Sequence, residues 1–330
     1  MCLILLFCLV LPLLAQGERR NPLPIPDIAG YSTLKCDFHM HTVFSDGVVW
    51  PETRVAEAWR DGLDCLAITD HDDYHPHKET VSTDLSKPHA IAAPLARRLG
   101  LVLVPGIEIT KGDLHVNALF VTDFNATAGK PLLESLREAK RQNAFTFWNH
   151  PGWKGRLDWY PEIDEAHRQG LLDGVEVVNF GKLEPQTLGW IGPKNLTILS
   201  NTDIHELVEI PAGQHRESIT LVFARSRDLD GIREALKQRR TLAWLRDELW
   251  GQPNLLRPLA DSLLSARRAD KLVIFRNRGS IPLSLQVGQE TVFVHANAET
   301  RIELPQGPKK VEVLNFHRTA GGNLSFTAEW

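Results

Sequence analysis

Cysteine is scarce in this sequence. The 330 residues include four cysteines, and two of them, Cys2 and Cys8, fall in an apolar segment at the start of the chain. The remainder holds only Cys36 and Cys65, which allows at most one disulfide. A framework built on several disulfides is therefore excluded.

Basic residues are not in excess either. The chain has 37 lysines and arginines against 41 aspartates and glutamates, a formal net charge of −4. Nucleic-acid-binding surfaces usually carry a basic excess, so we expect no nucleic-acid partner. Hydrophobic residues make up 43% of the chain, which is enough for a core and excludes global disorder. Beyond the opening segment no apolar run is long enough to span a bilayer.

The opening segment is an apolar run of twelve residues at positions 3–14, LILLFCLVLPLL. Twelve residues are too few for a membrane helix, which needs about 20, and are typical of the hydrophobic region of a signal peptide. Ala15 and Gly17 supply small residues for cleavage. We therefore expect a signal peptide at 1–17 and a periplasmic or secreted protein, with a buried N-terminal helix as the alternative. The Pro-rich residues that follow predict a linker at 18–33.

Apolar runs then alternate with helical stretches. The expected strands are 34–41, 63–69, 101–108, 115–121, 144–149, 174–179 and 196–201, with helices at 52–61, 90–99, 132–142 and 162–169. Pro51, Pro131 and Pro161 precede three of these helices, and proline is favoured in a first helical turn. Such alternation predicts parallel βαβ units. The fold class is therefore α/β, a seven-stranded (β/α) barrel over 34–270.

The pattern changes after Asp203. We expect a strand at 218–224, a helix at 228–239, and helical structure at 241–269 interrupted by Gly251 and Pro253. From Lys271 onward, short apolar runs alternate with turn residues, which is typical of a β-sandwich. The domain boundary is therefore placed near residue 270, with a small β-sandwich domain at 271–330.

The 13 histidines are distributed unevenly, because ten of them lie in the first 205 residues. Several stand beside carboxylates at the carboxyl ends of expected strands, the end of a (β/α) barrel that holds the active site. His39 and His41 are two positions apart on one strand and so face the same side. Asp46 lies within reach in the following loop.

Further candidate metal ligands stand at later strand ends. His71 lies between Asp70 and Asp72, which can orient a ligating imidazole. Glu108 ends a strand, where a carboxylate can bridge two cations. The remaining candidates are His115, His150, Asp203 and His205.

Six imidazoles and three carboxylates exceed the needs of one tetrahedral zinc site. They suffice for two to three divalent transition metals, and donors of this kind without thiolate suit Mn, Fe or Zn. Cys36 is expected to face away from the site as buried packing. His75, His77 and His89 lie in a loop with prolines and are interpreted as solvated residues rather than ligands.

Five segments between residues 36 and 205 carry these candidates, namely DFHMHTVFSDG, AITDHD, PGIEITKGDLH, NHPG and NTDIH. In this order they resemble the PHP (polymerase and histidinol phosphatase) family of metal-dependent phosphoesterases. The resemblance implies a distorted seven-stranded (β/α) barrel. It also implies one metal on His39, His41, Glu108 and Asp203, a second on Glu108, His115 and His150, and a third on Asp46, His71 and His205.

The signal segment and the C-terminal β-domain are similar to a secreted branch of this family. That resemblance implies a phosphodiesterase acting on small organic phosphodiesters through a metal-bridged hydroxide. Bound metal lowers the pKa of water and offsets charge that develops on phosphoryl oxygens. Asp203 or His205 is expected to move protons as general base or acid.

Cationic residues near these loops are candidates for gripping the phosphate. Arg216 is preferred, because arginine suits bidentate phosphate contacts, and Lys111 is a second candidate. Lys154, Arg156 and Lys182 are others, and a solvated surface charge is the alternative for all five. Trp148, Trp153 and Trp159 flank His150 and either wall the pocket or pack in the core.

Three other functions are compatible with parts of the pattern. One is a phosphomonoesterase of the histidinol-phosphatase or nucleotide-phosphatase type. Another is an amidohydrolase, although such barrels usually carry a bridging lysine and no expected strand here ends in lysine at that place. The third is a non-catalytic extracytoplasmic metal-binding module. The physiological substrate and the oligomeric state stay open.

Overall fold

The computed structural model describes residues 19–155, 157–210 and 214–330. The expected signal peptide at 1–17 and the candidate Arg156 lie outside these ranges. Within them, no helix is both long enough and apolar enough to cross a membrane.

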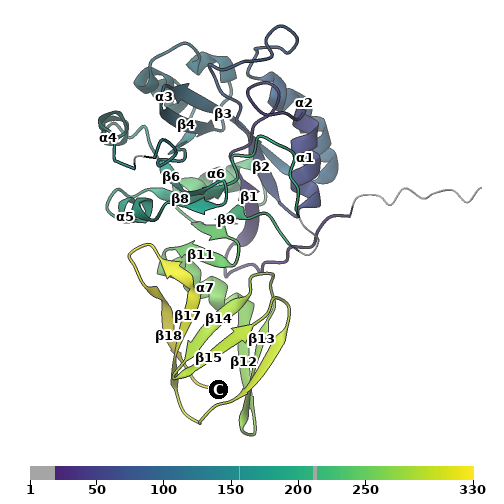
Figure 1. Ribbon diagram of the computed structural model, residues 1–330, viewed down its shortest axis with the longest axis vertical. Helices are drawn as coiled ribbons and strands as arrows, with labels where there is room; N and C mark the ends of the chain where they lie inside the picture. Colours follow the sequence, from purple (N-terminus) through teal and green to yellow (C-terminus); the bar gives the residue numbers. More distant parts are fainter. Residues whose placement is uncertain (1–18, 156, 211–213) are drawn as a thin grey trace, which may run out of the picture.

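A curved sheet forms the centre of the first part of the molecule (Figure 1). Its strands are β1 (Ser32–Asp37), β2 (Cys65–Ile68), β3 (Val102–Lys111), β4 (Leu114–Leu119), β5 (Phe145–Trp148), β6 (Gly174–Asn179) and β8 (Thr197–Asn201). They follow one another in this order, with β8 paired to β6. The segments that follow β1 and β8 also meet, at an isolated parallel bridge between Met40 and Ile204. The seven expected strands are present and the expected fold class is confirmed.

One strand departs from the expected parallel pattern. β4 is antiparallel to both β3 and β5. Only Gly112 and Asp113 separate β3 from β4, and a turn this short leaves no room for the crossover that parallel strands need. Gly112 adopts a φ of +61°, a left-handed conformation open to glycine at little cost.

Helices lie around this sheet (Figure 1). They are α1 (Pro51–Arg60), α2 (Lys87–Leu99), α3 (Leu132–Arg141), α4 (Pro161–Arg168), α5 (Leu188–Ile191) and α6 (Leu229–Lys237), with short 3-10 helices at Phe124–Thr127 and Pro185–Thr187 and a short strand β7 (Lys182–Leu183). Pro51 and Pro161 open α1 and α4, as the sequence indicated. Gly100 ends α2 in the left-handed conformation, which is a common helix terminator.

The expected helical structure at 241–269 is wrong for much of its length. The chain forms β9 (Ser218–Ala224), then a hairpin of β10 (Thr241–Leu245) and β11 (Glu248–Gly251), then helix α7 (Pro253–Leu263). β10 lies between β9 and β11 and all five of its residues are buried. A strand buried on both faces lacks the alternation that distinguishes a strand from a helix in sequence.

Two layers of strands make up the C-terminal part, at the lower end of Figure 1. One contains β12 (Leu264–Ala269), β13 (Leu272–Asn277) and β16 (Glu299–Glu303), and the other contains β14 (Leu283–Val287), β15 (Glu290–Val294), β17 (Lys309–Arg318) and β18 (Asn323–Ala328). Phe275 of the first layer and Leu285 and Val313 of the second belong to one buried apolar cluster. This is the expected small β-sandwich.

The β-sandwich is continuous with the central sheet. β17 pairs in parallel with β11, where Leu249 lies opposite Phe316. The buried apolar cluster that fills the sandwich also contains Leu66 of β2 and Leu221 of β9. Because β12 already pairs with β13, the strands of the C-terminal part begin at residue 264, and the boundary near residue 270 stays a prediction.

The segment expected to be a linker is anchored along this junction. Leu23 and Ile25 are buried in the same apolar cluster. The Pro24 carbonyl accepts a hydrogen bond from the N–H of Ser280 over 2.8 Å. The described part of the segment therefore ties the sandwich to the barrel.

Candidate metal centre

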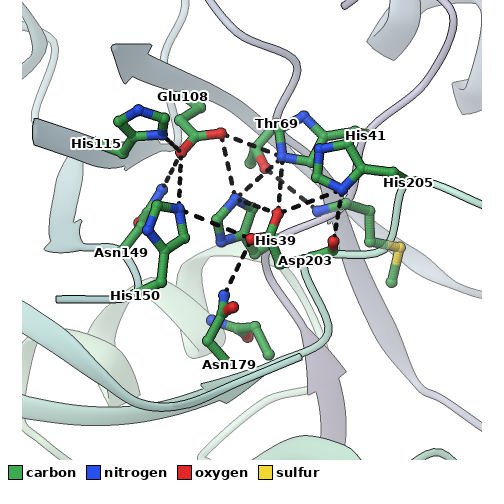
Figure 2. A network of polar contacts seen from close by, with 12 residues as sticks. His39, His41, Thr69, Glu108, His115, Asn149, His150, Asn179, Asp203 and His205 are labelled. Atoms are coloured by element: carbon green, nitrogen blue, oxygen red, sulfur yellow. Dashed lines mark hydrogen bonds and ion pairs between the residues drawn. The ribbon is translucent and has the colours of Figure 1, made fainter. Parts of the chain in front are cut away.

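The end of β1 presents two histidines on the same side. His39 and His41 follow β1 directly and are fully buried, and their Nε2 atoms are 3.1 Å apart (Figure 2). Spacing of two residues in an extended chain places both rings on one face. Arg54 of α1 fixes the segment, because its Nε donates to the His41 carbonyl over 2.8 Å.

The carboxylate of Glu108, in β3, lies between two sets of imidazoles (Figure 2). Its Oε2 is 3.2 Å from Nε2 of both His39 and His41. Its Oε1 is 2.9 Å from Nδ1 of His115 and 3.6 Å from Nε2 of His150. This is the placement that a carboxylate shared by two cations requires.

Asp203, just beyond β8, meets the same histidines from another strand end. Its Oδ1 is 3.1 Å from Nε2 of both His39 and His41, and its Oδ2 is 3.7 Å from Nε2 of His150. Asp203 has a φ of +53°, which is uncommon for a residue with a side chain. A hydrogen bond from its N–H to the His39 carbonyl over 2.9 Å holds it there.

A third group lies at the outer side of the centre. Asp46 places Oδ1 3.2 Å from Nε2 of His205 and Oδ2 3.4 Å from Nε2 of His71. The side chains of Asp46 and His205 are each 31% exposed, whereas His39 and Glu108 are fully buried. The centre therefore opens to solvent beside Asp46 and His205.

All nine candidate ligands from the sequence gather at this end of the barrel. Their donor atoms form four overlapping groups, each within 4.8 Å, namely His41, Asp46, His71 and His205; His39, His150 and Asp203; His39, His41 and Glu108; and His71, Glu108 and His115. The set expected for a third metal thus lies together, with His41 added. The sets expected for the first and second metals are both divided, because Asp203 is grouped apart from Glu108 and His115 apart from His150.

The donor set fits divalent cations. Asp46 Oδ1 and Asp203 Oδ1 are buried and make no hydrogen bond to a described residue. Imidazole nitrogens lie 3.1 Å from Asp203 Oδ1, but their directions are not those of a hydrogen bond. A buried acceptor without a partner is costly, and a cation held by imidazole and carboxylate, as Mn, Fe or Zn is, supplies that partner.

Without a cation, these groups shift one another's pKa values. Burial lowers the pKa of His39, but the negative charges of Asp203 and Glu176 outweigh burial and raise this pKa well above its ordinary value. Burial raises the pKa of Glu108, but positive charge on His71 and His39 holds it well below its ordinary range. In the metal-free protein the imidazoles of the cluster therefore hold protons, and a metal ion must displace these protons in order to bind.

Glu176, in the middle of β6, is a buried carboxylate that the sequence analysis did not single out. Its Oε1 lies 2.9 Å from Nδ1 of His39, and its Oε2 accepts a hydrogen bond from the backbone N–H of His150 over 2.8 Å. A carboxylate only accepts, so Nδ1 of His39 carries a proton and Nε2 faces the centre. The signal was a glutamate inside the apolar run GVEVVN.

Two asparagines also orient the carboxylates (Figure 2). Asn149 Nδ2 donates to Glu108 Oε1 over 2.8 Å. Asn179 Nδ2 donates to Asp203 Oδ2 over 3.3 Å and to the Glu176 carboxylate over 2.9 Å. Asn149 follows β5 and Asn179 ends β6, and as neutral residues both lie outside the ionisable candidates of the sequence.

Of the two carboxylates that flank His71, Asp70 is linked to an imidazole, that of His41, through the hydroxyl of Ser45. Asp70 accepts a hydrogen bond from Ser45 Oγ over 2.6 Å, and Ser45 Oγ lies 3.2 Å from Nδ1 of His41. Asp72 instead pairs with Lys111, whose Nζ is 2.9 Å from its Oδ1.

The expectation that Arg216 is an open phosphate ligand needs correction. Arg216 is 2% exposed, and its Nε and Nη1 bind the carboxylates of Asp61 and Asp37 over 2.9 and 3.1 Å. The guanidinium neutralises two buried negative charges, so its place is structural. Lys111 is half-buried at the edge of the centre and paired with Asp72.

The other sequence candidates divide between surface, core and site. Lys154 pairs with Asp113 and Lys182 with Glu184 on the surface. Trp148 is buried and stacks on Trp190 in the core, where Trp159 also packs. Trp153 is the tryptophan that reaches the centre, with its ring 5.0 Å from that of His115.

Cys36 is buried as expected, and His75 and His77 lie in the expected loop. The expectation for His89 is wrong, because it lies in helix α2 with its ring 5.7 Å from that of Phe124. Cys36 and Cys65 are free and buried, opposite each other on β1 and β2. None of the four groups of clustered donors contains His75, His77 or His89. His215 packs against Trp244 with ring centroids 4.4 Å apart.

Comparison with known proteins places this arrangement in a family. No model of a known protein family matches the sequence. A crystal structure from Bacteroides vulgatus, of a two-domain protein containing a predicted PHP-like metal-dependent phosphoesterase, superposes with a TM-score of 0.88 and 36% identity. The superposition covers 95% of this chain and 100% of that chain.

A curated relative matches over a shorter stretch. The 5'-3' exoribonuclease Rnm of Salmonella typhimurium is 39% identical over 142 residues. This match covers 42% of this chain and 41% of that protein, so more than half of each lies outside it. The full-length structural match, together with the expected fold and the gathered donor set, shows that the chain belongs to the PHP-like metal-dependent phosphoesterases.

Proposed function

We propose that this protein is a metal-dependent phosphodiesterase that hydrolyses small organic phosphodiesters. The observation that carries the proposal is the position of Glu108, whose two oxygens face separate sets of imidazoles over 2.9–3.6 Å. Cations held by these adjacent sets would share one carboxylate. Divalent metals in such a pair lower the pKa of water and neutralise the charge on a phosphoryl group.

The residues proposed to hold the metals are the nine that gather at the rim, and two to three metals of the Mn, Fe or Zn type suit them. Asp203 and His205 are the proposed proton-transfer residues. His205 is 31% exposed, and its Nδ1 is fixed by the Asp203 carbonyl at 2.8 Å. Its orientation is thereby set while the ring stays in contact with solvent.

Charge supports a diester rather than a monoester. A phosphomonoester carries nearly two negative charges and a diester carries one. Lys111 is paired with Asp72, and Arg216 with Asp37 and Asp61, so neither is a free cation for the extra charge. Histidinol-phosphatase-like or nucleotide-phosphatase activity is therefore less well supported.

A nuclease activity is the second candidate, and the 39% identity with an exoribonuclease over 142 residues favours it. The excess of acidic residues, with a formal net charge of −4, opposes it, because strand binding relies on basic side chains.

We also propose export to the periplasm or medium, on the basis of the apolar run at 3–14. Sequencing the N-terminus of protein from the extracytoplasmic fraction tests the export proposal.

The function is tested by a substrate panel with the metal-reconstituted enzyme. We expect bis(p-nitrophenyl) phosphate to be hydrolysed faster than p-nitrophenyl phosphate and a short single-stranded RNA, with activity lost in chelator and restored by Mn, Fe or Zn. Faster turnover of the monoester or the RNA assigns the protein to that class instead.

A further inference from the structure

A cavity of about 690 Å³ is lined by residues from the loops that carry Asp46, Asp203 and His205, although none of the nine candidate ligands lines it. The first wall comes from the loop that carries Asp46. Val48 lines the cavity, stands two residues after Asp46, and donates its backbone N–H to the carbonyl of His205 over 3.0 Å. This wall is therefore joined directly to the outer group of candidate ligands.

Two other walls are joined to the centre in the same way. Phe180 lines the cavity and follows Asn179, whose amide contacts the Asp203 carboxylate over 3.3 Å. Thr202, Ile204 and Glu206 also line it and alternate along the chain with the ligands Asp203 and His205 (Figure 2 shows these two ligands).

The centre is most exposed beside Asp46 and His205. Among the candidate ligands, Asp46 and His205 have side chains that are 31% exposed, against 0% for His39 and Glu108 and 8% for His71. A phosphate ester held at the centre must direct its bulky substituent toward solvent. A substituent that leaves the centre beside Asp46 and His205 would pass the loops that line the cavity.

The cavity presents apolar side chains to solvent. Val48 is 54% exposed, Leu207 58% and Phe180 71%. Three large exposed apolar side chains around one concave surface are unusual and mark a binding region. Ligand sites are typically apolar cavities with a few polar groups that fix the ligand.

The charged groups that line the cavity are mainly acidic. Glu206 and Glu209 are exposed, line the cavity and have no ion pair with any residue in the described ranges. Glu217 is paired with Arg246. Arg216 also lines the cavity, but it is buried, and its Nε and Nη1 bind two carboxylates, while its Nη2 has no hydrogen-bond partner among the described residues. A second phosphate bound here would be repelled, whereas a neutral or cationic group would not.

We propose that this cavity binds the second ester group of the phosphodiester, and that this group is an uncharged or cationic organic moiety with an apolar surface. The inference rests on the proposed phosphodiesterase function and adds the class of substrate. Phe180, Val48 and Leu207 would contact the apolar surface, and Glu206 and Glu209 would favour a cationic end.

The test uses p-nitrophenyl phosphodiesters that differ only in the second alcohol. Methyl p-nitrophenyl phosphate is the reference, because a methyl group offers the least surface for contact with the cavity. Phenyl and choline esters probe apolar and cationic groups, and thymidine 3'-phosphate 5'-(p-nitrophenyl phosphate) carries a second phosphate. We expect kcat/KM for the phenyl and choline esters to exceed that for the methyl ester by about tenfold or more, with the second-phosphate ester lowest.

Two variants test whether the preference among the second ester groups arises in the cavity. Phe180→Ala should raise KM for the phenyl ester by about tenfold and leave kinetics with the methyl ester unchanged. The double variant Glu206→Lys, Glu209→Lys should weaken turnover of the choline ester and improve that of the second-phosphate ester. Phe293→Ala, in β15 and 46% exposed, is the matched control and should change nothing.

The outcomes separate this inference from the function on which it rests. Turnover of the methyl ester at the same kcat/KM as the phenyl and choline esters would overturn the cavity proposal while leaving the phosphodiesterase intact. An equal effect of Phe180→Ala on all esters would do the same. If no p-nitrophenyl diester is hydrolysed by the reconstituted protein, the phosphodiesterase function fails and the cavity proposal falls with it.

Discussion

Nδ1 of His39 lies 2.9 Å from Oε1 of Glu176, and both side chains are fully enclosed by protein. The same carboxylate accepts the backbone N–H of His150 over 2.8 Å, where His150 has the unusual φ of +29°. One side chain thereby sets the ring orientation of one candidate ligand and the strained backbone of another. Carboxylates that hold ligating imidazoles in this way tune metal affinity.

Replacing Glu176 should therefore weaken metal binding without removing a ligand. Glu176→Gln keeps the shape but substitutes one acceptor with a donor, so either His39 or His150 loses its partner. We expect metal affinity and activity to fall by about 10–100-fold. Metal content measured by elemental analysis after dialysis tests this, with the exposed Glu162→Gln of α4 as control. Full metal content in the Glu176 variant contradicts the positioning role.

Glu108→Ala should abolish turnover, because it removes the carboxylate that both sets of imidazoles share. Metal content should fall by more than one ion per chain. Circular dichroism should show that the secondary structure persists, and Glu108→Gln provides a second variant of unchanged volume. An active Glu108→Ala protein would show that the ligand set is wrong.

Asp46→Asn should remove the outermost cation selectively. Asp46 contacts His71 and His205 over 3.4 and 3.2 Å and His41 over 3.5 Å, and it has no ion pair with His39, His115 or His150 in the described structure. We expect one metal fewer per chain than in the wild type, with the inner metals retained. Loss of all metal, or of none, contradicts this division.

The metal-free protein should lose stability as pH rises above neutrality. Neighbouring carboxylates raise the folded-state pKa of His39, His41 and His205 despite their burial. Stabilisation from a raised pKa is complete below the ordinary histidine value of about 6.5 and is lost as pH rises through the folded value. Thermal unfolding in chelator between pH 5 and 9 measures this.

The carboxylates act in the opposite pH range. Surrounding imidazoles lower the pKa of Asp203 and Glu108, so their stabilisation is present above the ordinary carboxyl values of about 4 and is lost as pH falls through the folded values. Metal binding needs neutral imidazoles, so affinity should rise with pH. A melting temperature of the metal-free protein that climbs steadily from pH 6 to 9 would refute the assigned shifts.

Arg216→Met should destabilise the fold rather than weaken substrate binding. It leaves Asp37 and Asp61 buried without their shared cation, and breaking a buried ion pair costs about 3–5 kcal/mol. Urea unfolding measures the loss. KM for a phosphodiester at a temperature where the variant stays folded should be unchanged, and a large rise in KM would restore Arg216 as a substrate ligand.

The sequence was sufficient for the candidate ligands because they occupy strand ends, where a histidine or carboxylate interrupts an apolar run. Glu176 was missed because it lies inside a strand. The period-two pattern of a strand does not show whether a carboxylate in an apolar run points into the site or toward solvent. Arg216 was placed wrongly because its partners Asp37 and Asp61 are distant in sequence. The β10–β11 hairpin was missed because β10 is covered on both faces.

Because β17 pairs in parallel with β11 and one apolar cluster is common to both parts, we expect the two parts to unfold together. Opening of the sandwich would uncover the edge of the sheet whose other strands carry the histidines. We therefore expect that such opening would also displace the histidines at the strand ends, so that the metals would be held less tightly. A substitution in the C-terminal strands, far in sequence from any ligand, should be detected first as faster release of metal.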